Sequence, residues 1–314
     1  MILIVTSRSD YTADWLILEL TRRGAPFVRF NTEDYPTETL LRWTDGGAGE
    51  LRFSDRNVDL DDVRSVWYRR PVPPALSPGL PPGQTAWAAA ESREALDGLW
   101  RTVDTRWVNH PDRNRLADSK PEQLRRARDL GFAVPTSLIT NSGNLAREFV
   151  AAQAASVVCK PLFSGRIETN TGLRLFFTSQ LDAQAVAALD ELGPEPYLFQ
   201  ALITKRYDVR ATVIGDEVFA ARIESQLTPE AEVDWRRADS LTLPYQTETL
   251  SPDVEAACID LVRSYGLLFG AIDLAFTDEG YVFFEINPNG QWGWIEQRTD
   301  LPLRARLADL LSAP

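Results

Sequence analysis

The chain has 314 residues, of which 44% are hydrophobic and 25% are charged, and its net charge is -12. This composition predicts a folded protein with roughly two or three compact lobes, and the acidic balance argues against a surface built to neutralise the phosphates of a nucleic acid. No run of about 18 apolar residues occurs, and the opening residues lack a signal-peptide pattern, so we expect a cytoplasmic protein without a membrane partner.

The N-terminal part shows the alternation of strands and helices that is typical of a parallel sheet. Apolar residues recur at helical spacing between the first two predicted strands, until Gly24 ends the pattern. A glycine-rich stretch at 45–49 predicts a hairpin turn, and six prolines between residues 71 and 84 predict an irregular linker before a helix over about 85–103. The predicted strands lie at 2–5, 26–30, 49–53 and 65–68. We therefore expect residues 1–106 to form a small α/β domain.

The rest of the chain predicts two α+β parts, at 107–196 and 197–314. In the first, Pro121 is placed as a first-turn proline of a helix that ends at Gly131. Strands at 137–140 and 156–161 enclose a further helix at 144–154. In the second, Gly215-Asp216 predicts a hairpin turn, and an apolar stripe over 254–262 predicts an amphipathic helix.

The last two strands predict a metal site. They are expected at 269–277 and 281–287, joined by a three-residue loop with Gly280 in a bulge. This register sets Asp273 opposite Glu285 and leaves Asn287 on the same face of the sheet. Two facing carboxylates repel each other without a cation, and hard oxygen ligands suit Mg²⁺. A solvated polar face is the alternative, although both strands are otherwise strongly apolar.

Several cationic side chains could accompany such a metal. Lys160 ends an apolar strand, where a buried ammonium group is costly unless it meets an anion. Lys120, by itself, has the pattern of an ordinary surface lysine. Asp208 and Arg210 share one face of a strand, where a surface ion pair is the simple alternative. The loop at 162–172 offers phosphate-covering residues, namely Ser164, Gly165, Thr169 and Thr171.

The scarcity of histidine and cysteine limits the chemistry that the chain can perform. His110 is the single histidine, and we interpret it as an incidental loop residue. Cys159 and Cys258 lie in apolar segments without the spacing of a zinc site, so we expect both to be buried and free. Lysines, carboxylates and a metal fit this inventory better than acid–base catalysis by histidine.

In their order along the chain, these residues resemble the ATP-grasp superfamily over about residues 107 to 311. The resemblance rests on Lys120, Lys160, the strand at 199–203, Asp208-x-Arg210, and Asp273 followed by Glu285-Ile286-Asn287. It implies an ATP-grasp fold, in which two α+β lobes hold ATP between them behind a small α/β domain. Within that superfamily, Trp67-Tyr68-Arg69-Arg70-Pro71 and the segment 285–292 resemble the maturases of ribosomal peptides of the microviridin or graspetide type.

The resemblance also implies roles, cofactors and a partner. Maturases of this type use ATP and Mg²⁺ to phosphorylate Asp or Glu side chains of a precursor peptide, leader plus core, and then join them to Ser, Thr or Lys side chains. Carried over, Arg210 stabilises the acyl phosphate, Asp208 orients Arg210 or takes a proton, and Arg222 binds a substrate carboxylate. The remaining assignments are Lys120 and Lys160 to the phosphates, Gln200, Ala201, Leu202 and Ile203 to the adenine, and Asp273, Glu285 and Asn287 to Mg²⁺. A homodimer is a further expectation of the resemblance.

Other interpretations stay open at this point. One is a ligase that adds a free amino acid to a carboxylate, and another is a nucleotide-binding scaffold without turnover. Trp292 and Trp294 line a peptide groove in one interpretation and pack in the core in the other. Whether the product bonds are esters or amides does not follow from the sequence.

Overall fold

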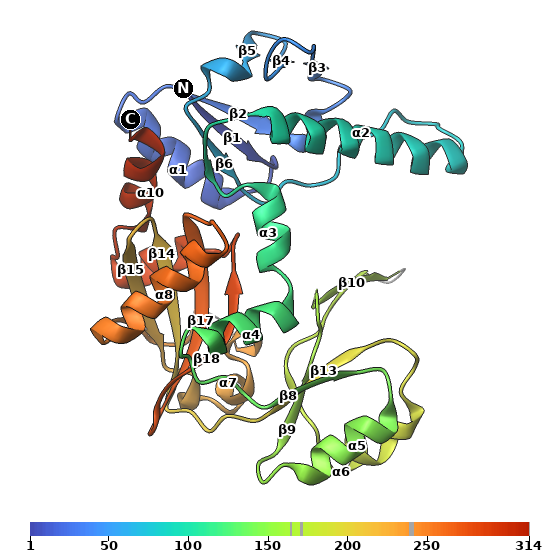
Figure 1. Cartoon of the computed structure of the whole chain (residues 1–314), viewed down its shortest axis with the longest axis vertical. Helices are drawn as coiled ribbons and strands as arrows, with labels where there is room; N and C mark the ends of the chain where they lie inside the picture. The colour runs from blue at the N-terminus through green and yellow to red at the C-terminus, as the bar shows by residue number, and fades with distance from the viewer. Residues whose placement is uncertain (164, 170–171, 239–241, 314) are drawn as a thin grey trace.

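The computed structural model describes residues 1–163, 165–169, 172–238 and 242–313, and for 166–169 and 173 it describes the backbone alone. Figure 1 shows an N-terminal domain above two lobes, one built on a five-stranded sheet and the other on a four-stranded sheet. Both chain ends lie at the N-terminal domain. Within the described part of the chain, no helix combines the length and apolar character that crossing a bilayer requires.

The N-terminal domain is built on a parallel sheet in the order β2-β1-β6-β7. Its strands are β1 (Ile2–Thr6), β2 (Phe27–Asn31), β6 (Ser65–Tyr68) and β7 (Arg106–Val108). Alternate residues of β1 face α1 (Tyr11–Arg22) on one side and α2 (Pro82–Thr102) on the other. The predicted strand–helix–strand order is therefore confirmed, and the proline-rich segment is irregular until α2 begins.

A small antiparallel sheet lies beside that domain. It consists of β3 (Leu40–Arg42), β4 (Glu50–Arg52) and β5 (Asn57–Asp59). β3 and β4 pair around residues 43–49, which confirms the predicted hairpin turn. Leu51 and Val58 of this sheet pack against Trp100 of α2 in one buried cluster, so the sheet belongs to the domain's core.

The smaller of the two lobes has an antiparallel sheet in the order β12-β9-β13-β8. Its strands are β8 (Ser137–Thr140), β9 (Val157–Lys160), β12 (Ser179–Gln180) and β13 (Tyr197–Ala201). Helices α5 (Gly143–Ala152) and α6 (Ala183–Ala187) cover one face, where Ala146 packs on Val157 and Phe199. A separate antiparallel pair, β10 (Arg166–Thr169) and β11 (Gly172–Leu175), extends from this lobe.

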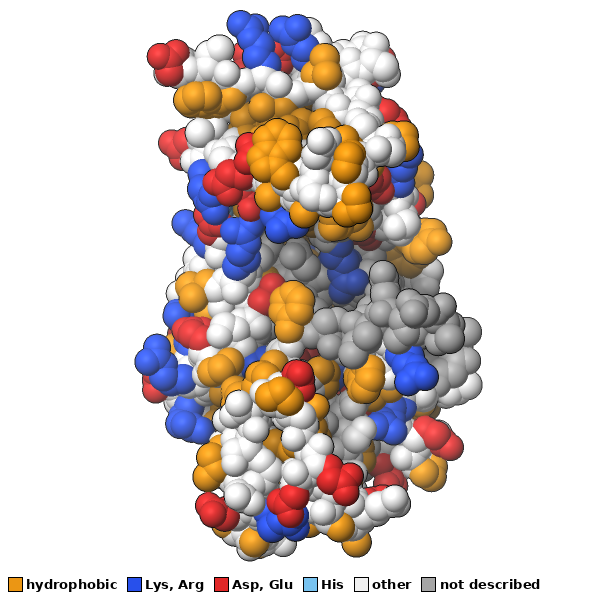
Figure 2. Space-filling model, turned by 90° about the vertical axis from the view of Figure 1, so that its right-hand side faces the viewer, with side chains coloured by type: hydrophobic (Ala, Val, Ile, Leu, Met, Phe, Trp, Pro, Cys, Tyr) orange, Lys and Arg blue, Asp and Glu red, His pale blue; other side chains and the backbone are white. Residues whose placement is uncertain are grey.

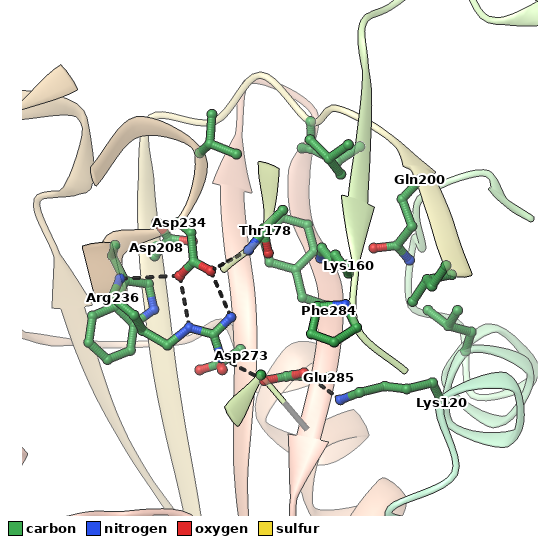
Figure 3. A pocket seen from close by; sticks show the side chains of 18 of the residues that line it. Lys120, Lys160, Thr178, Gln200, Asp208, Asp234, Arg236, Asp273, Phe284 and Glu285 are labelled. Atoms are coloured by element: carbon green, nitrogen blue, oxygen red, sulfur yellow. Dashed lines mark hydrogen bonds and ion pairs between the residues drawn. The ribbon is translucent and has the colours of Figure 1, made fainter. Parts of the chain in front are cut away.

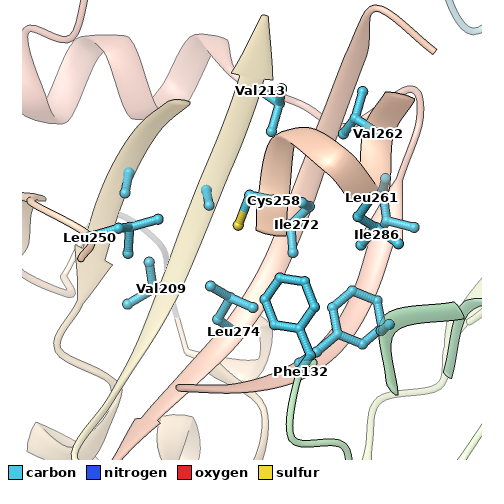
Figure 4. Packing of buried hydrophobic residues seen from close by; sticks show 14 of the residues in the cluster. Phe132, Val209, Val213, Leu250, Cys258, Leu261, Val262, Ile272, Leu274 and Ile286 are labelled. Atoms are coloured by element: carbon cyan, nitrogen blue, oxygen red, sulfur yellow. The ribbon is translucent and has the colours of Figure 1, made fainter. Parts of the chain in front are cut away.

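The larger lobe has an antiparallel sheet in the order β16-β15-β14-β17-β18. The strands are β14 (Tyr207–Ile214), β15 (Glu217–Ile223), β16 (Tyr245–Glu248), β17 (Phe269–Thr277) and β18 (Gly280–Asn287). One face packs on α8 (Pro252–Ser264), α3 (Pro111–Ala117) and α4 (Lys120–Asp129). Figure 4 shows this core, in which Cys258 and Leu261 of α8 meet Ile272 and Leu274 of β17. The other face carries the polar side chains that meet the small lobe, and at one end it packs on the N-terminal domain and the C-terminal helices.

The C-terminal helices join the large lobe to the N-terminal domain. α9 (Gly293–Thr299) and α10 (Leu303–Ser312) follow β18, and α10 packs beside α1. Leu307 of α10 lies in one buried cluster with Ile4 of β1 and Ile214 of β14. The N-terminal domain and the large lobe therefore share a hydrophobic core. Further short elements are α7 (Pro229–Val233) and 3₁₀ helices at Thr32–Asp34, Leu60–Asp62, Ala188–Glu191, Ser225–Leu227 and Trp235–Arg237.

The sheets divide the chain differently from the expected ranges 107–196 and 197–314. β13 begins at Tyr197 but pairs with β8 and β9 of the small sheet. In the other direction, Ala117 and Leu124 of α3 and α4 pack in the core of the large lobe. The small lobe is thus an insertion between α4 and β14, and its last strand carries the chain back to the large sheet.

Two predictions about single residues need correction. His110 is not incidental, because its Nδ1 accepts a hydrogen bond from Asp112 N (3.2 Å) at the start of α3 and its ring packs on Trp107. Both cysteines are free, as expected, but Cys159 is only half-buried whereas Cys258 is fully buried. Cys159 lies on β9, where it packs against the cluster under α5 and α6.

Candidate active site

A cavity of about 330 Å³ lies between the small and large lobes. This volume is in the range of small-molecule sites. Figure 2 shows a recess on one face of the molecule, below the N-terminal domain, with lysine and arginine side chains at its rim. Charged residues that line the cavity are Asp118, Lys120, Lys160, Lys205, Asp208, Asp234, Arg236, Asp273 and Glu285. Figure 3 shows Lys160 of the small lobe together with Asp273 and Glu285 of the large lobe around this space.

The predicted metal residues meet on one face of the large sheet. Asp273 pairs with Glu285 across β17 and β18, and Ala271 pairs with Asn287, so Glu285 and Asn287 share the face of Asp273. The loop is not the predicted one: Thr277 pairs with Gly280, which leaves a two-residue turn. A β-bulge at Phe284 then shifts the register by one residue and restores the predicted pairing of the carboxylates. The bulge also brings Phe284 to the cavity beside Glu285.

The backbone between the metal residues is held by α4. Gln123 is fully buried, and its Nε2 donates to Ile286 O (3.0 Å) while its Oε1 accepts from Ile286 N (3.2 Å). Because β18 is an edge strand, these two bonds replace a missing neighbour. Asn287 Oδ1 accepts from Asn289 N (2.9 Å), which orients the amide. The strand that carries Glu285 and Asn287 is therefore fixed on both sides.

The N-terminal domain holds the segment that follows Asn287. Arg69 is buried, and its Nη1 donates to the carbonyls of Asn289 (2.6 Å) and Gly290 (2.9 Å). Arg70 Nε donates to the same Asn289 carbonyl (2.9 Å). Asn109, at the end of β7, donates through Nδ2 to Pro288 O (3.0 Å). The motif at 67–71 thus holds, from another domain, the segment that follows β18.

Asp273 and Glu285 differ in their electrostatic surroundings. Burial raises the pKa of Asp273 to about 6, although Arg210 Nη1 lies 3.0 Å from its Oδ1. Burial also disfavours ionisation of Glu285, but the charges of Lys120, Arg236 and Lys160 outweigh it and hold the pKa of Glu285 well below its ordinary value. Lys120 Nζ contacts Glu285 Oε2 directly, and Arg236 Nη1 lies 3.6 Å from Oε1.

Lys160 enters the cavity from the opposite lobe. Its ammonium group lies 4.7 Å from the centre of the Phe284 ring, and burial lowers its pKa to about 8. Among the described residues, none forms a hydrogen bond or ion pair with Lys160 Nζ. A half-buried cation whose described contact is an aromatic face suits an anionic ligand.

Asp208 and Arg210 lie on the cavity side of β14, but they do not pair with each other. Asp208 forms an ion pair with Lys205 (2.8 Å), and burial raises the pKa of Asp208. Arg210 is paired with Asp273 and lies beneath it, outside the cavity lining. The expectation that Asp208 orients Arg210 is therefore wrong in this structure, since each residue has its own partner.

The structure does not bring Arg222 to the cavity. Arg222 pairs with Val209 across β14 and β15, so its side chain lies on the face opposite that of Asp208 and Arg210. There the guanidinium group stacks on Tyr207 at 3.8 Å and forms an ion pair with Glu224 (2.6 Å). The side chain therefore points away from the cavity, and the assignment of Arg222 to a substrate carboxylate is wrong.

The residues expected at the adenine form an edge of the cavity. Gln200, Ala201, Leu202 and Ile203 all line it, at the end of β13. The amides of Ala201 and Leu202 donate to Thr136 O (2.9 Å) and Ser156 O (2.7 Å). The Ile203 amide has no acceptor among the described residues, so it is available to a ring nitrogen. Apolar walls come from Leu124, Val158, Leu198 and Ile286.

Several functional candidates were missed by the sequence interpretation. Lys205 could have been noticed, because it precedes Asp208 by three residues and pairs with it. Asp234 and Arg236 lie in the long connection between β15 and β16, which has no periodicity that would mark them. Asp118 ends α3, and burial raises its pKa.

The two tryptophans near the C-terminus and the loop expected to cover phosphates are the remaining sequence expectations. Trp292 is fully buried and belongs to the core, while Trp294 packs on Trp235 and Tyr245. Of the loop expected to cover phosphates, Gly165 lines the cavity. Ser164 and Thr171 lie outside the described residues, and the side chain of Thr169 is also outside that description.

The residues present fit Mg²⁺ together with a nucleotide. Asp273, Glu285 and Asn287 supply hard oxygen atoms, and Asp273 Oδ1 is buried without a hydrogen bond. The described residues contain no group of three acidic, histidine or cysteine side chains arranged for a metal. Mg²⁺ ordinarily takes one or two carboxylates and completes its octahedron with phosphate oxygens and water. The cationic lysines opposite are suited to the phosphates.

Comparisons with known proteins agree with this geometry. Residues 1–115 match the family model of the MvdD pre-ATP grasp domain, and residues 123–311 match that of the RimK-like ATP-grasp domain. A solved RiPP-associated ATP-grasp ligase of Chryseobacterium gregarium, in complex with ADP and a leader and core peptide, is 30% identical with a TM-score of 0.90. That similarity covers 100% of this chain and 97% of the ligase.

Two further relatives are similar to different extents. Macrocyclase MdnC of Microcystis aeruginosa, bound with precursor peptide MdnA, is 29% identical with a TM-score of 0.88, over 99% of each chain. A curated probable alpha-L-glutamate ligase of Mannheimia succiniciproducens is 24% identical over 204 residues, or 64% of this chain. The match spans 65% of that relative, slightly less than two thirds of its length.

Proposed function

Because the chain belongs to the RimK-like ATP-grasp ligases, we propose that it forms side-chain macrocycles in a ribosomally made precursor peptide. It activates an Asp or Glu side chain of the peptide and joins it to a Ser, Thr or Lys side chain. ATP and Mg²⁺ are the usual cofactors of this family. Since both ATP and a newly made peptide are available in the cytoplasm, we place the reaction there.

The reaction has two steps that balance without a redox partner. The peptide carboxylate attacks the γ-phosphorus of ATP, the bond to the bridging oxygen breaks, and ADP leaves. The resulting acyl phosphate is then attacked by a hydroxyl or amino group of the same peptide. Phosphate departs with the electron pair, the nucleophile loses a proton, and an ester or amide remains. The net change in the peptide is the loss of one water for each ring.

We assign roles to the cavity residues on this basis. Asp273, Glu285 and Asn287 would hold Mg²⁺, which neutralises charge on the phosphates. Lys160 binds phosphate oxygens from the small lobe, and Lys120 does so from the first turn of α4. Residues 200–203 contact the adenine. To Asp208, whose carboxyl group is buried against Lys205, we assign the proton of the attacking group.

The single observation that carries the proposal is the agreement between the cavity and the full-length similarity. The lysines, the carboxylates and the adenine edge converge from two lobes. Two solved relatives that contain peptides are similar over nearly the whole chain, including the N-terminal domain. The amino-acid-adding ligase is similar over 64% of the chain. We therefore favour a peptide substrate over a free amino acid.

One incubation separates the three candidate functions. The purified protein is mixed with ATP, Mg²⁺ and the peptide encoded beside its gene, and peptide masses and ADP are measured together. Loss of water from the peptide, with one ADP for each ring, supports the proposal. A gain in mass supports the amino-acid ligase instead. Nucleotide binding without ADP formation supports a scaffold.

A further inference from the structure

Arg236 is a cationic cavity residue that neither the family motifs nor the comparisons assign. It lies in the 3₁₀ helix Trp235–Arg237, and its side chain is 46% exposed, within a cavity that it helps to line. We propose that Arg236 binds the γ-phosphoryl group of ATP during its transfer to the peptide carboxylate. The inference deepens the proposed function and rests on it only for the use of ATP.

The guanidinium group of Arg236 is held in a fixed orientation. Nε lies 2.8 Å from Asp234 Oδ1, and Nη2 lies 2.9 Å from Asp234 Oδ2, which makes a bidentate pair. Asp234 is itself buried and accepts from Thr178 N (3.0 Å) beside β12. The arginine is thus anchored to the small lobe through Asp234, although it belongs to the large lobe.

The bidentate pair with Asp234 leaves one edge of the Arg236 guanidinium group open. Nη1 forms no hydrogen bond with a described residue and lies 3.6 Å from Glu285 Oε1. Figure 3 shows Arg236 between Asp234 and the carboxylates of Asp273 and Glu285. Burial lowers the pKa of Arg236, but Asp234 and Glu285 more than compensate and raise it above the ordinary value. The group therefore stays charged beside Glu285, which we assign to Mg²⁺.

Arg210 cannot take this role in the observed arrangement. Its side chain is 8% exposed and is paired with Asp273 at the cavity floor, so it has no face toward a phosphate. Arg236 is the arginine that lines the cavity among the described residues. A planar group with fixed donors is suited to the spreading charge of a transferring phosphoryl group, and it needs no reorganisation during the reaction.

The test measures nucleotide affinity without any peptide. Isothermal titration calorimetry with Mg²⁺ compares AMPPNP, which has a γ-phosphate group, with ADP, which has none. Arg236→Gln is expected to weaken AMPPNP by about tenfold or more and ADP by less than about twofold. Arg236→Lys, which keeps the charge but loses the fork, should give an intermediate loss for AMPPNP. Thermal melting of each variant identifies any general loss of structure.

Arg237→Gln is the matched control. Arg237 lies on the same turn, donates to Thr178 O (2.8 Å) and Ser179 Oγ (2.6 Å), and is not part of the cavity lining. Its loss should weaken the contact between the lobes without changing the ratio of the two affinities. Equal weakening of AMPPNP and ADP in Arg236→Gln, or no weakening of either, would overturn the proposal. Both results leave the ligase function intact, because ring formation is measured separately.

Discussion

Arg210 and Asp273 face each other across β14 and β17, with Arg210 Nη1 3.0 Å from Asp273 Oδ1. Both side chains are buried, and the ion pair lacks the geometry of a hydrogen bond. Arg210 thus opposes the effect of burial and of the Glu285 charge on the pKa of Asp273. The arginine of the Asp208-x-Arg210 motif therefore pairs with the carboxylate that we propose as a metal ligand.

Replacing Arg210 with methionine should destabilise the protein. The change leaves Asp273 buried without its counter-charge, a loss that costs about 3 to 5 kcal/mol in comparable pairs. The double variant Arg210→Met with Asp273→Asn removes both charges and should recover part of that loss. Urea unfolding of the single and double variants measures the difference. Equal stabilities of the single and double variants would show that Arg210 does not offset the buried charge of Asp273.

Glu285→Gln should weaken the use of Mg²⁺. The neutral amide keeps the shape of the side chain but removes the charge that we assign to the metal. We expect ATP turnover at limiting Mg²⁺ to fall by at least about 100-fold. Glu279→Gln, at the exposed turn of the same hairpin, is the control and should retain activity. A normal Mg²⁺ dependence in Glu285→Gln would contradict the assignment.

Nucleotide binding should weaken at alkaline pH through Lys160. Burial lowers the pKa of this lysine to about 8, so its charge is lost between pH 7 and 9 in the free protein. ADP affinity should fall by about tenfold over that interval, and Lys160→Met should flatten the profile. Calorimetry at several pH values measures both curves. A profile that is unchanged by Lys160→Met would assign the titration to another group.

The expected loss of nucleotide affinity at alkaline pH would not come from unfolding of the protein through Lys160. Its pKa in the unfolded chain is near 10.5. Between pH 8 and 10.5 the unfolded chain therefore binds more protons than the folded protein at this position. The contribution of Lys160 to stability consequently rises with pH in that window, opposite to the expected change in affinity.

Arg222→Ala tests the correction to the sequence interpretation. The side chain lies on the α8 side of the sheet, stacked on Tyr207, so it has no contact with the cavity. We expect kcat/KM for ring formation to stay within about twofold, with at most a modest loss of stability. A loss of activity of about 100-fold or more would return Arg222 to the reaction.

The shared face of the proposed metal residues could be predicted because its signal is local. Period-two alternation placed Asp273, Glu285 and Asn287 on one face, and the structure agrees. The loop was nevertheless misassigned. A two-residue turn shifts the register by one, and the bulge at Phe284 shifts it back, so the two differences cancel. A bulge inside a strand leaves no sequence signal comparable to a glycine in a turn.

The remaining site residues depend on tertiary contacts that no local pattern reports. Arg236 is set by its pair with Asp234 and by Thr178 of the other lobe, 56 residues earlier than Asp234. Arg222 was assigned to the wrong face of the sheet, because the face on which its side chain lies depends on how β15 pairs with β14. Arg69 was recognised within a motif, but its contacts with Asn289 and Gly290 come from another domain.

The most direct test of the central claim is a joint measurement of ADP and peptide mass. The purified protein is incubated with Mg²⁺, ATP and the peptide encoded beside its gene, in parallel with Glu285→Gln. The account predicts one ADP for each water lost from the peptide, and neither product with the variant. ADP formation with an unchanged peptide, or water loss that persists in Glu285→Gln, would contradict it.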